Sequence, residues 1–357
     1  MSGDAPRGLT GRDSIQAPAM TTITSEASIS DLDINYEDEV GEAMLEEARQ
    51  AEFSPEVEEI IRDDGVLGDR RFFTWQWIYY IFGEPLTIGP VPEEHRQIAQ
   101  EAKFLAGAYI TLVDDLAEKH GDKETFWELA KAAYPGMTPD WDREDIRRDY
   151  ARSTERVWNA LTDRLQAAPR FEEFVEPFMY DLRVAVESMD FARMSGEYPA
   201  FANRAETWQF ETAAIGVYVF WDADLMFAPS FERDDYHEFR EAMYEIQHMW
   251  RLGNWVITWE REVHEKDFSA GIFVEAIRQG VISEDDLERL EDGELDPEVV
   301  TDRIRSSGIV GQFVWDWKRR RDELRERAFE MESIDANDLV DKMEWLMRSH
   351  LATEGHR

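Results

Sequence analysis

Apolar side chains recur at intervals of three and four residues through the chain after residue 37, which is the pattern of amphipathic α-helices. Strand signals are scarce, because alternation of β-branched residues is nearly absent and no Asn-Gly hairpin turn occurs. The pattern therefore predicts an all-α fold of about ten or more helices. The predicted helical segments are 38–53, 55–63, 69–82, 92–119, 123–133, 139–167, 171–194, 205–226, 234–265, 269–280, 283–292, 297–306, 309–333 and 335–352.

The ordered part of the chain is expected to form one domain. No repeat of fixed period is present, which disfavours a solenoid. No break in composition divides residues 38–357, so we predict a single large helical domain there. Residues 1–37 are rich in Ser, Thr, Gly, Asp and Pro with little apolar periodicity, and we expect a disordered, acidic N-terminal tail.

The charge balance is strongly acidic. Asp and Glu number 78 against 39 Lys and Arg, so the formal net charge is −39, and the acidic residues are spread along the whole chain. The negative charges repel one another in the compact state, and dissolved salt screens this repulsion. The composition therefore favours a salt-adapted, halophilic protein of a cytoplasm with high internal salt. An acidic surface for a basic partner is the alternative. Nucleic acid and anionic lipid are disfavoured as partners.

Further classes are excluded by what the sequence lacks. It has no cysteine, and therefore no disulfide, thiolate metal site or cysteine nucleophile. It has no apolar run of about 18 residues, so we expect no stable membrane insertion. No basic region followed by an apolar one occurs near residue 1, so no secretory signal is expected, and the predicted location is cytoplasmic.

One candidate site lies at the end of the segment 92–119. Asp114, Asp115 and Glu118 follow the apolar pair Leu112 and Val113. On a helix, Asp114 and Glu118 share a face, and this stripe is otherwise core-facing. Buried carboxylates are costly unless a cation or another partner accompanies them. In so acidic a chain, however, an Asp-Asp pair by itself is more often a surface feature.

A second polar row lies in the segment 234–265. Asn254, Thr258 and Glu262 are four residues apart, which aligns an amide, a hydroxyl and a carboxylate on one helix face. Oxygen-only ligand sets suit Mg²⁺. Arg261 is placed to meet a phosphate oxygen. This mixed row carries more of the inference than the Asp-Asp pair does, because salt adaptation explains surface acids but not an Asn and a Thr.

These two motifs resemble those of the class I terpene synthases. The family motif D-D-x-x-D/E is matched by Asp114, Asp115 and Glu118, and N-D-x-x-S/T-x-x-K/R-E is matched by Asn254, Thr258, Arg261 and Glu262. Trp255 replaces the acidic residue after the Asn. The motifs are 140 residues apart, a separation of the family's order, and the resemblance extends over roughly residues 60–350.

The resemblance implies an all-α fold around an aromatic-lined cavity, with three Mg²⁺ ions, for which Mn²⁺ can substitute, between the two motifs. These ions would promote ionisation of a linear prenyl diphosphate, farnesyl or geranylgeranyl, followed by cyclisation in a divergent, haloarchaeal-type enzyme acting as monomer or homodimer. The metal ligands implied are Asp114, Asp115, Glu118, Asn254, Thr258 and Glu262. Candidate cavity-wall residues are Phe72, Trp75, Tyr79, Phe104, Tyr109, Tyr218, Trp221 and Trp250.

Two parts of the family pattern are matched less closely. The diphosphate-sensing Arg is assigned to Arg204, which lies 50 residues before Asn254, ahead of a helix break expected at 212–216. The C-terminal Arg-Tyr pair has no match, and Arg348 or the basic cluster 318–321 are the candidates to replace it.

Three rival functions remain open. A trans-prenyltransferase would need a second aspartate-rich motif, and Asp285-Asp286 is followed by Arg289 at the place of the third acid. A squalene- or phytoene-type synthase would also need paired aspartate-rich motifs. A non-catalytic, salt-adapted helical scaffold would show no magnesium dependence.

Overall fold

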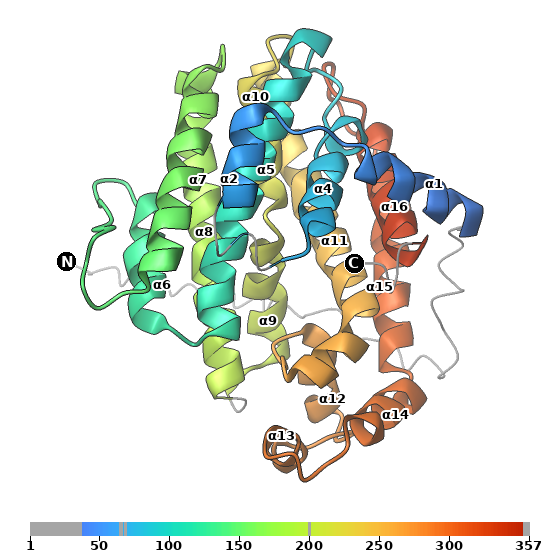
Figure 1. Cartoon of the computed structure of the whole chain (residues 1–357). Coiled ribbons are helices and arrows are strands. Elements are labelled where there is room, and N and C mark those ends of the chain that lie inside the picture. Colours follow the sequence, from blue (N-terminus) through green and yellow to red (C-terminus); the bar gives the residue numbers. More distant parts are fainter. Residues whose placement is uncertain (1–37, 64–66, 68–69, 199–200, 353–357) are drawn as a thin grey trace, which may run out of the picture.

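The computed structural model of the chain is all-α, without a strand among the residues that it describes, which are 38–63, 67, 70–198 and 201–352 (Figure 1). The predicted tail, 1–37, lies outside the described residues. The α-helices are α1 (Asp38–Arg49), α2 (Pro55–Asp63), α4 (Phe72–Ile81), α5 (Glu93–Asp114), α6 (Lys123–Ala130), α7 (Arg148–Gln166), α8 (Phe171–Glu197), α9 (Arg204–Phe210), α10 (Val217–Met226), α11 (Tyr236–Glu265), α12 (Gly271–Arg278), α13 (Glu284–Glu291), α14 (Pro297–Ser307), α15 (Ile309–Glu326) and α16 (Ala336–Ala352).

The long helices stand side by side around one continuous apolar core, which confirms the predicted all-α class. Helix α5 packs against α7 and α10, α8 packs against α10, and α11 packs against α15 and α16. Figure 1 shows α5 and α11 near the middle of the bundle, with α12, α13 and α14 gathered at its lower end. In the described part of the chain, no helix combines the length and the apolar character needed to cross a membrane.

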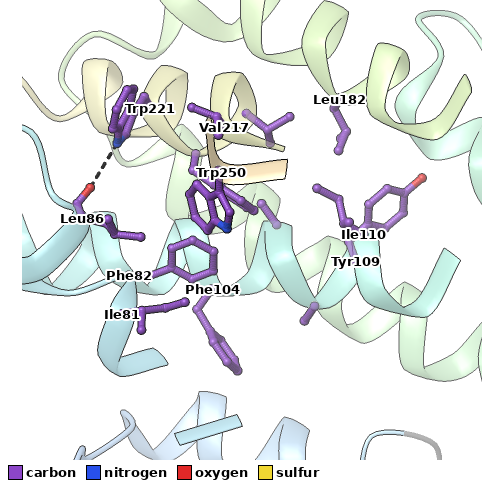
Figure 2. Packing of buried hydrophobic residues seen from close by; sticks show 14 of the residues in the cluster. Ile81, Phe82, Leu86, Phe104, Tyr109, Ile110, Leu182, Val217, Trp221 and Trp250 are labelled. Carbon is purple, nitrogen blue, oxygen red and sulfur yellow. Dashed lines mark hydrogen bonds between the residues drawn. The ribbon is translucent and has the colours of Figure 1, made fainter. Parts of the chain in front are cut away.

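A buried ion pair fixes how α5 and α10 pack. Lys103 and Asp224 have fully buried side chains, and the Lys103 Nζ lies 3.0 Å from the Asp224 carboxylate. The same Nζ donates to the hydroxyl of Thr87, and the backbone N–H of Ile88 donates to Asp224. Nearby, the Trp221 indole N–H donates to the carbonyl oxygen of Leu86 at 3.1 Å (Figure 2). The loop before α5 is thereby tied to α10.

The predicted helix is wrong for residues 139–147 and for residues 327–333, which follow the end of α15 at Glu326. The segment 139–167 was expected to be helical throughout, but α7 begins only at Arg148. In residues 139–147, which precede α7, two backbone N–H groups donate instead to side chains of α6. Glu128 accepts from the Asp140 N–H at 2.7 Å, and Thr125 accepts from the Arg147 N–H at 3.0 Å. These tertiary hydrogen bonds replace the helical ones.

The expected helix break at 212–216 is confirmed. Helix α9 ends at Phe210, a 3₁₀ turn covers Glu211–Ile215, and Gly216 separates that turn from α10 with φ of 76°. A left-handed backbone conformation of this kind favours glycine. A Cβ on Gly216 would also lie 3.1 Å from side-chain atoms of Ile110 and Phe220, so any larger residue would push these neighbours aside.

Candidate functional site

The first motif lies where α5 changes its helical form. Helix α5 ends at Asp114, and Asp115–Lys119 form one π-helical turn. Such turns are rare and frequently occur at functional sites. Asp114 and Glu118 keep part of their surface accessible to solvent, whereas Asp115 is buried. The motif therefore does not continue the straight helix that the sequence pattern predicted.

Asp115 faces partly different neighbours from Asp114. The Asp115 carboxylate accepts a 2.6 Å hydrogen bond from Nη2 of Arg70. Its charge acts on Tyr150 and His120, which belong to the α7 side of the bundle. Asp114 and Glu118 interact electrostatically with Arg251 and Asp267, and the charge of Arg70 acts on Asp114 as well. Arg70 therefore acts on both adjacent aspartates.

The second motif lies on α11, and its residues occupy the predicted row. The Thr258 hydroxyl donates to the backbone carbonyl of Asn254 at 2.8 Å. Glu262 is 9% exposed, and its Oε2 atom is buried without a hydrogen-bond partner. Because Glu262 and Asp114 both interact with Arg251 and Asp267, the two motifs converge on the same charged cluster.

Arg251 links this cluster to the helix break. It precedes Asn254 by one helical turn, and its Nη1 donates to the Asn254 side-chain oxygen at 3.3 Å. Its Nη2 donates to Glu211, the first residue of the 3₁₀ turn between α9 and α10, and Glu211 is fully buried. The charges of Glu118 and Glu262 also act on the guanidinium.

Burial and like charge make these carboxyl groups hard to ionise. Burial, with the neighbouring charge of Asp115, raises the pKa of Asp114 to about 7. Burial, with the charge of Asp267, raises the pKa of Glu262 to about 7. The pKa of Glu118 is raised well above its ordinary value by burial and by Asp114. Perturbed carboxyl groups concentrated in one place are a mark of functional sites.

The donor set suits a hard cation, although no ready-made metal site is present. Buried oxygens of Glu211 and Glu262 have no hydrogen-bond partner, which is costly unless a ligand satisfies them. Among the described residues, no three Asp, Glu or His side chains stand close enough together to hold a metal ion as they are. The chemistry of the donors therefore fits Mg²⁺, and binding would require their side chains to draw together.

The two predicted arginines lie at the edge of the cluster or outside it. Arg261 is exposed and forms an ion pair with Glu265 one turn along α11, at 2.7 Å. Its charge nevertheless acts on Glu262. Arg204, the first residue of α9, lines a cavity of about 10 Å³ together with Trp208 and Glu275. None of the interactions described for Asp114, Glu118, Glu211 or Glu262 involves Arg204.

The basic cluster 318–321 is engaged with acidic residues. Arg319 and Arg320 both pair with Asp316 within α15, and Arg320 also pairs with Glu245 of α11. Arg321 lies 3.7 Å from Glu344 of α16. These contacts give the cluster a role in joining α11, α15 and α16.

The predicted cavity-wall aromatics fall into separate groups. Trp75, Tyr79 and Phe72 pack with Phe53 and Phe104 where α4 and α5 meet the segment between α1 and α2. Tyr109 packs on Trp158 of α7, and Trp221 stacks on Phe239 of α11. Tyr218 lies under the Arg240 guanidinium. Figure 2 shows Trp250 beside Phe82, with Phe104, Tyr109 and Trp221 spread to different sides.

Trp250 is the predicted wall residue nearest to the motif row, being one turn before Asn254. It packs against Phe220 of α10 and lines a cavity of about 10 Å³ with Asn254, Trp317 and Met347. A space of this size holds at most about one water molecule. A prenyl chain would therefore need these side chains to move apart.

Three residues of the cluster were not predicted as site residues: Arg251, Glu211 and Asp267. The sequence contains a signal for Arg251, because Arg251, Asn254, Thr258 and Glu262 recur at spacings of three and four and share a helix face. No comparable pattern marks Glu211 or Asp267, which come from the helix break and from the turn after α11.

Comparison with known proteins adds no assignment. No protein-family model matches the sequence, and no curated protein matches it at a significant level. The case for a function therefore rests on the residues and their arrangement.

Proposed function

We propose that the protein is a Mg²⁺-dependent class I terpene synthase, which ionises a linear prenyl diphosphate, releases diphosphate and cyclises the carbocation. The observation that carries the proposal is that Asp114, Glu118 and Glu262 all interact electrostatically with the same two residues, Arg251 and Asp267. Two sequence motifs 140 residues apart thus share charged neighbours, which supports the proposal.

The side chains of the two motifs would bind the cations and thereby orient the diphosphate of the substrate. Asp114, Asp115 and Glu118 on one side and Asn254, Thr258 and Glu262 on the other are the proposed cation ligands. Bound Mg²⁺ would supply the positive charge that neutralises a diphosphate leaving group. The Asp115 carboxylate now accepts a hydrogen bond from Arg70, and it would have to give up this bond to bind a cation. Arg70 would therefore hold the carboxylate in place until a cation binds.

The apolar core beside the cluster would exclude water. Phe82 at the end of α4 packs on Phe220 of α10, and Phe220 packs on Trp250, which lies one turn before Asn254 on α11. Aromatic faces stabilise cations, and a dry site protects a carbocation from water. The proposed substrate pocket therefore opens from the small cavity at Trp250 and Asn254 rather than from the other predicted wall residues.

The trans-prenyltransferase alternative loses support at Asp285-Asp286. Asp286 forms a capping box with Ser283 at the start of α13 and pairs with Arg303. Its carboxylate is therefore satisfied by local partners. Asp285 is exposed. In Figure 1, α13 lies at the lower end of the molecule, away from the middle of the bundle.

The test is turnover with prenyl diphosphates. The purified protein in molar KCl with Mg²⁺ is given geranyl, farnesyl or geranylgeranyl diphosphate, and diphosphate release and organic products are measured. Asp114→Ala and Asn254→Ala should each lower turnover by about 100-fold or more, because each removes a ligand that stabilises the leaving group. Circular dichroism checks that both variants keep the helical fold.

Asp285→Ala is the matched control, since it removes an exposed aspartate from the rival motif and should leave turnover unchanged. Longer prenyl diphosphates among the products would indicate elongation instead of cyclisation. Absence of diphosphate release with all three substrates would leave the non-catalytic scaffold as the interpretation.

A further inference from the structure

Arg251 occupies the centre of the carboxylate cluster. It is only partly exposed and is hydrogen-bonded to Glu211 and Asn254, with its guanidinium 5.3 Å from the Trp255 ring centroid. It is also the group on which the charges of Glu118 and Glu262 act. One interior cation therefore serves residues from α5, α11 and the helix break.

The cluster holds more negative than positive groups. Asp114, Glu118, Glu211, Glu262 and Asp267 interact with one another or with this single guanidinium. Glu211 is 0% exposed, and its Oε1 atom has no hydrogen-bond partner. The buried Oε2 of Glu262 and the buried Nε of Arg251 also lack a hydrogen-bond partner. Buried polar atoms left unpaired are rare in folded proteins and point to a missing ligand.

We infer that Arg251 is a built-in counter-ion, which stabilises the cluster in the metal-free protein and which divalent cations must outcompete to bind there. The inference rests on the proposed function, since it concerns the same cation site. Arg251 is a positioning residue in this account: it holds α11 against the helix break through Glu211. A positive charge within the cluster repels an incoming cation, so Arg251 lowers cation affinity while it stabilises the protein.

The test is Arg251→Met, which keeps much of the side-chain length and removes the charge. Binding of Mg²⁺ and Mn²⁺ is measured by calorimetry, and thermal unfolding is followed in EDTA and in Mg²⁺. We expect cation affinity to rise by about tenfold or more. The melting temperature should fall in EDTA and recover in Mg²⁺, since a ligand that binds only the folded protein stabilises it. Arg251→Lys keeps the charge and should bind cations about as the wild type does.

Arg320→Met is the matched control. Arg320 is also largely interior and also forms an ion pair with an acid of another element, Glu245 of α11, but this pair lies outside the cluster. It changes the net charge by the same amount, so unchanged cation affinity in this variant excludes a general effect of charge. If Arg251→Met does not fold, Glu211→Gln/Arg251→Met is compared with Glu211→Gln, and the double variant should bind cations more tightly.

The outcomes separate the two proposals. Tighter cation binding in Arg251→Met, but not in Arg320→Met, supports the counter-ion role. Wild-type Mg²⁺ binding with equal or weaker binding in Arg251→Met overturns that role and leaves the proposed cation site standing. No binding of either cation by any of these proteins overturns both.

Discussion

Asp222 of α10 is a fully buried carboxyl group through which we expect the stability of the fold to depend on pH. Its side chain is fully buried beside Asp181 of α8, and it accepts a 3.2 Å hydrogen bond from the hydroxyl of Tyr236. Arg240 forms two hydrogen bonds with Asp181, at 2.7 and 3.0 Å, and lies 3.6 Å from Asp222. Burial and the neighbouring Asp181 raise the pKa of Asp222 well above its ordinary value.

The folded protein therefore binds this proton more tightly than the unfolded chain does. The resulting stability is present at low pH and is lost as pH rises from the ordinary aspartate value toward the raised pKa of Asp222, each unit of difference being worth about 1.4 kcal/mol. Asp222→Asn keeps an acceptor for Tyr236 without the charge. It should be more stable than the wild type at neutral pH and show a smaller loss of stability between pH 4 and 7, measured by urea unfolding.

Asp181→Asn is the comparison, because it removes the carboxylate to which Arg240 is bonded and should destabilise the protein at neutral pH. Equal pH dependence of Asp222→Asn and the wild type would show that Asp222 does not carry the proton.

At the scale of elements, the site depends on two departures from regular α-helix. The π-helical turn Asp115–Lys119 sets the directions of the first motif, and the 3₁₀ turn Glu211–Ile215 with Gly216 places Glu211 beside Arg251. Both turns pack against buried side chains. Leu116 and Ala117 of the π-helical turn lie in the core, and Gly216, after the 3₁₀ turn, faces Ile110 and Phe220. The core therefore holds these turns in their irregular forms.

Gly216→Ala tests the break. The substitution places a Cβ on a residue with φ of 76° and within 3.1 Å of Ile110 and Phe220. The backbone alone should cost about 1–2 kcal/mol, and the contact should add to this. Gly136→Ala is matched in φ, at 78°, but has open space around the Cβ. The difference in unfolding free energy between the two variants measures the packing at the break, and equal losses would argue against a tightly packed break.

At the scale of the whole molecule, charge is the dominant property. A net charge of −39 on 357 residues makes the compact state self-repelling, although several arginines form ion pairs with two or more acids each, such as Arg143, Arg164 and Arg325. The screening length falls from about 10 Å at 0.1 M salt to about 3 Å at 1 M. Salt therefore relieves the long-range repulsion more than it weakens the close ion pairs.

We expect the melting temperature to rise as KCl is increased from about 0.1 M to about 1 M, over the range in which the screening length shortens threefold. Choline chloride at equal ionic strength should give a similar rise if screening is the cause, and sucrose at equal osmolality serves as the uncharged control. A melting temperature that stays constant or falls in KCl would contradict salt adaptation.

The sequence by itself determined the helical class, most helix positions and the break before Gly216. It could do so because helical periodicity and glycine conformation depend on residues close together in the chain. It also identified the motif row on α11 from spacing alone. It could not exclude helix at 139–147, because the competing acceptors, the side chains of Thr125 and Glu128, belong to another helix.

Only the tertiary structure decided what the motifs meet. Arg251, Glu211 and Asp267 come from three elements, and their electrostatic cluster exists only after α11 has packed against the break. The aromatic residues show the same limit: the resemblance named Trp75, Tyr109 and Trp221 as candidate walls of one cavity, but which neighbour each ring contacts was decided by packing. Burial and proximity between distant residues are properties of the folded molecule, and no local pattern encodes them.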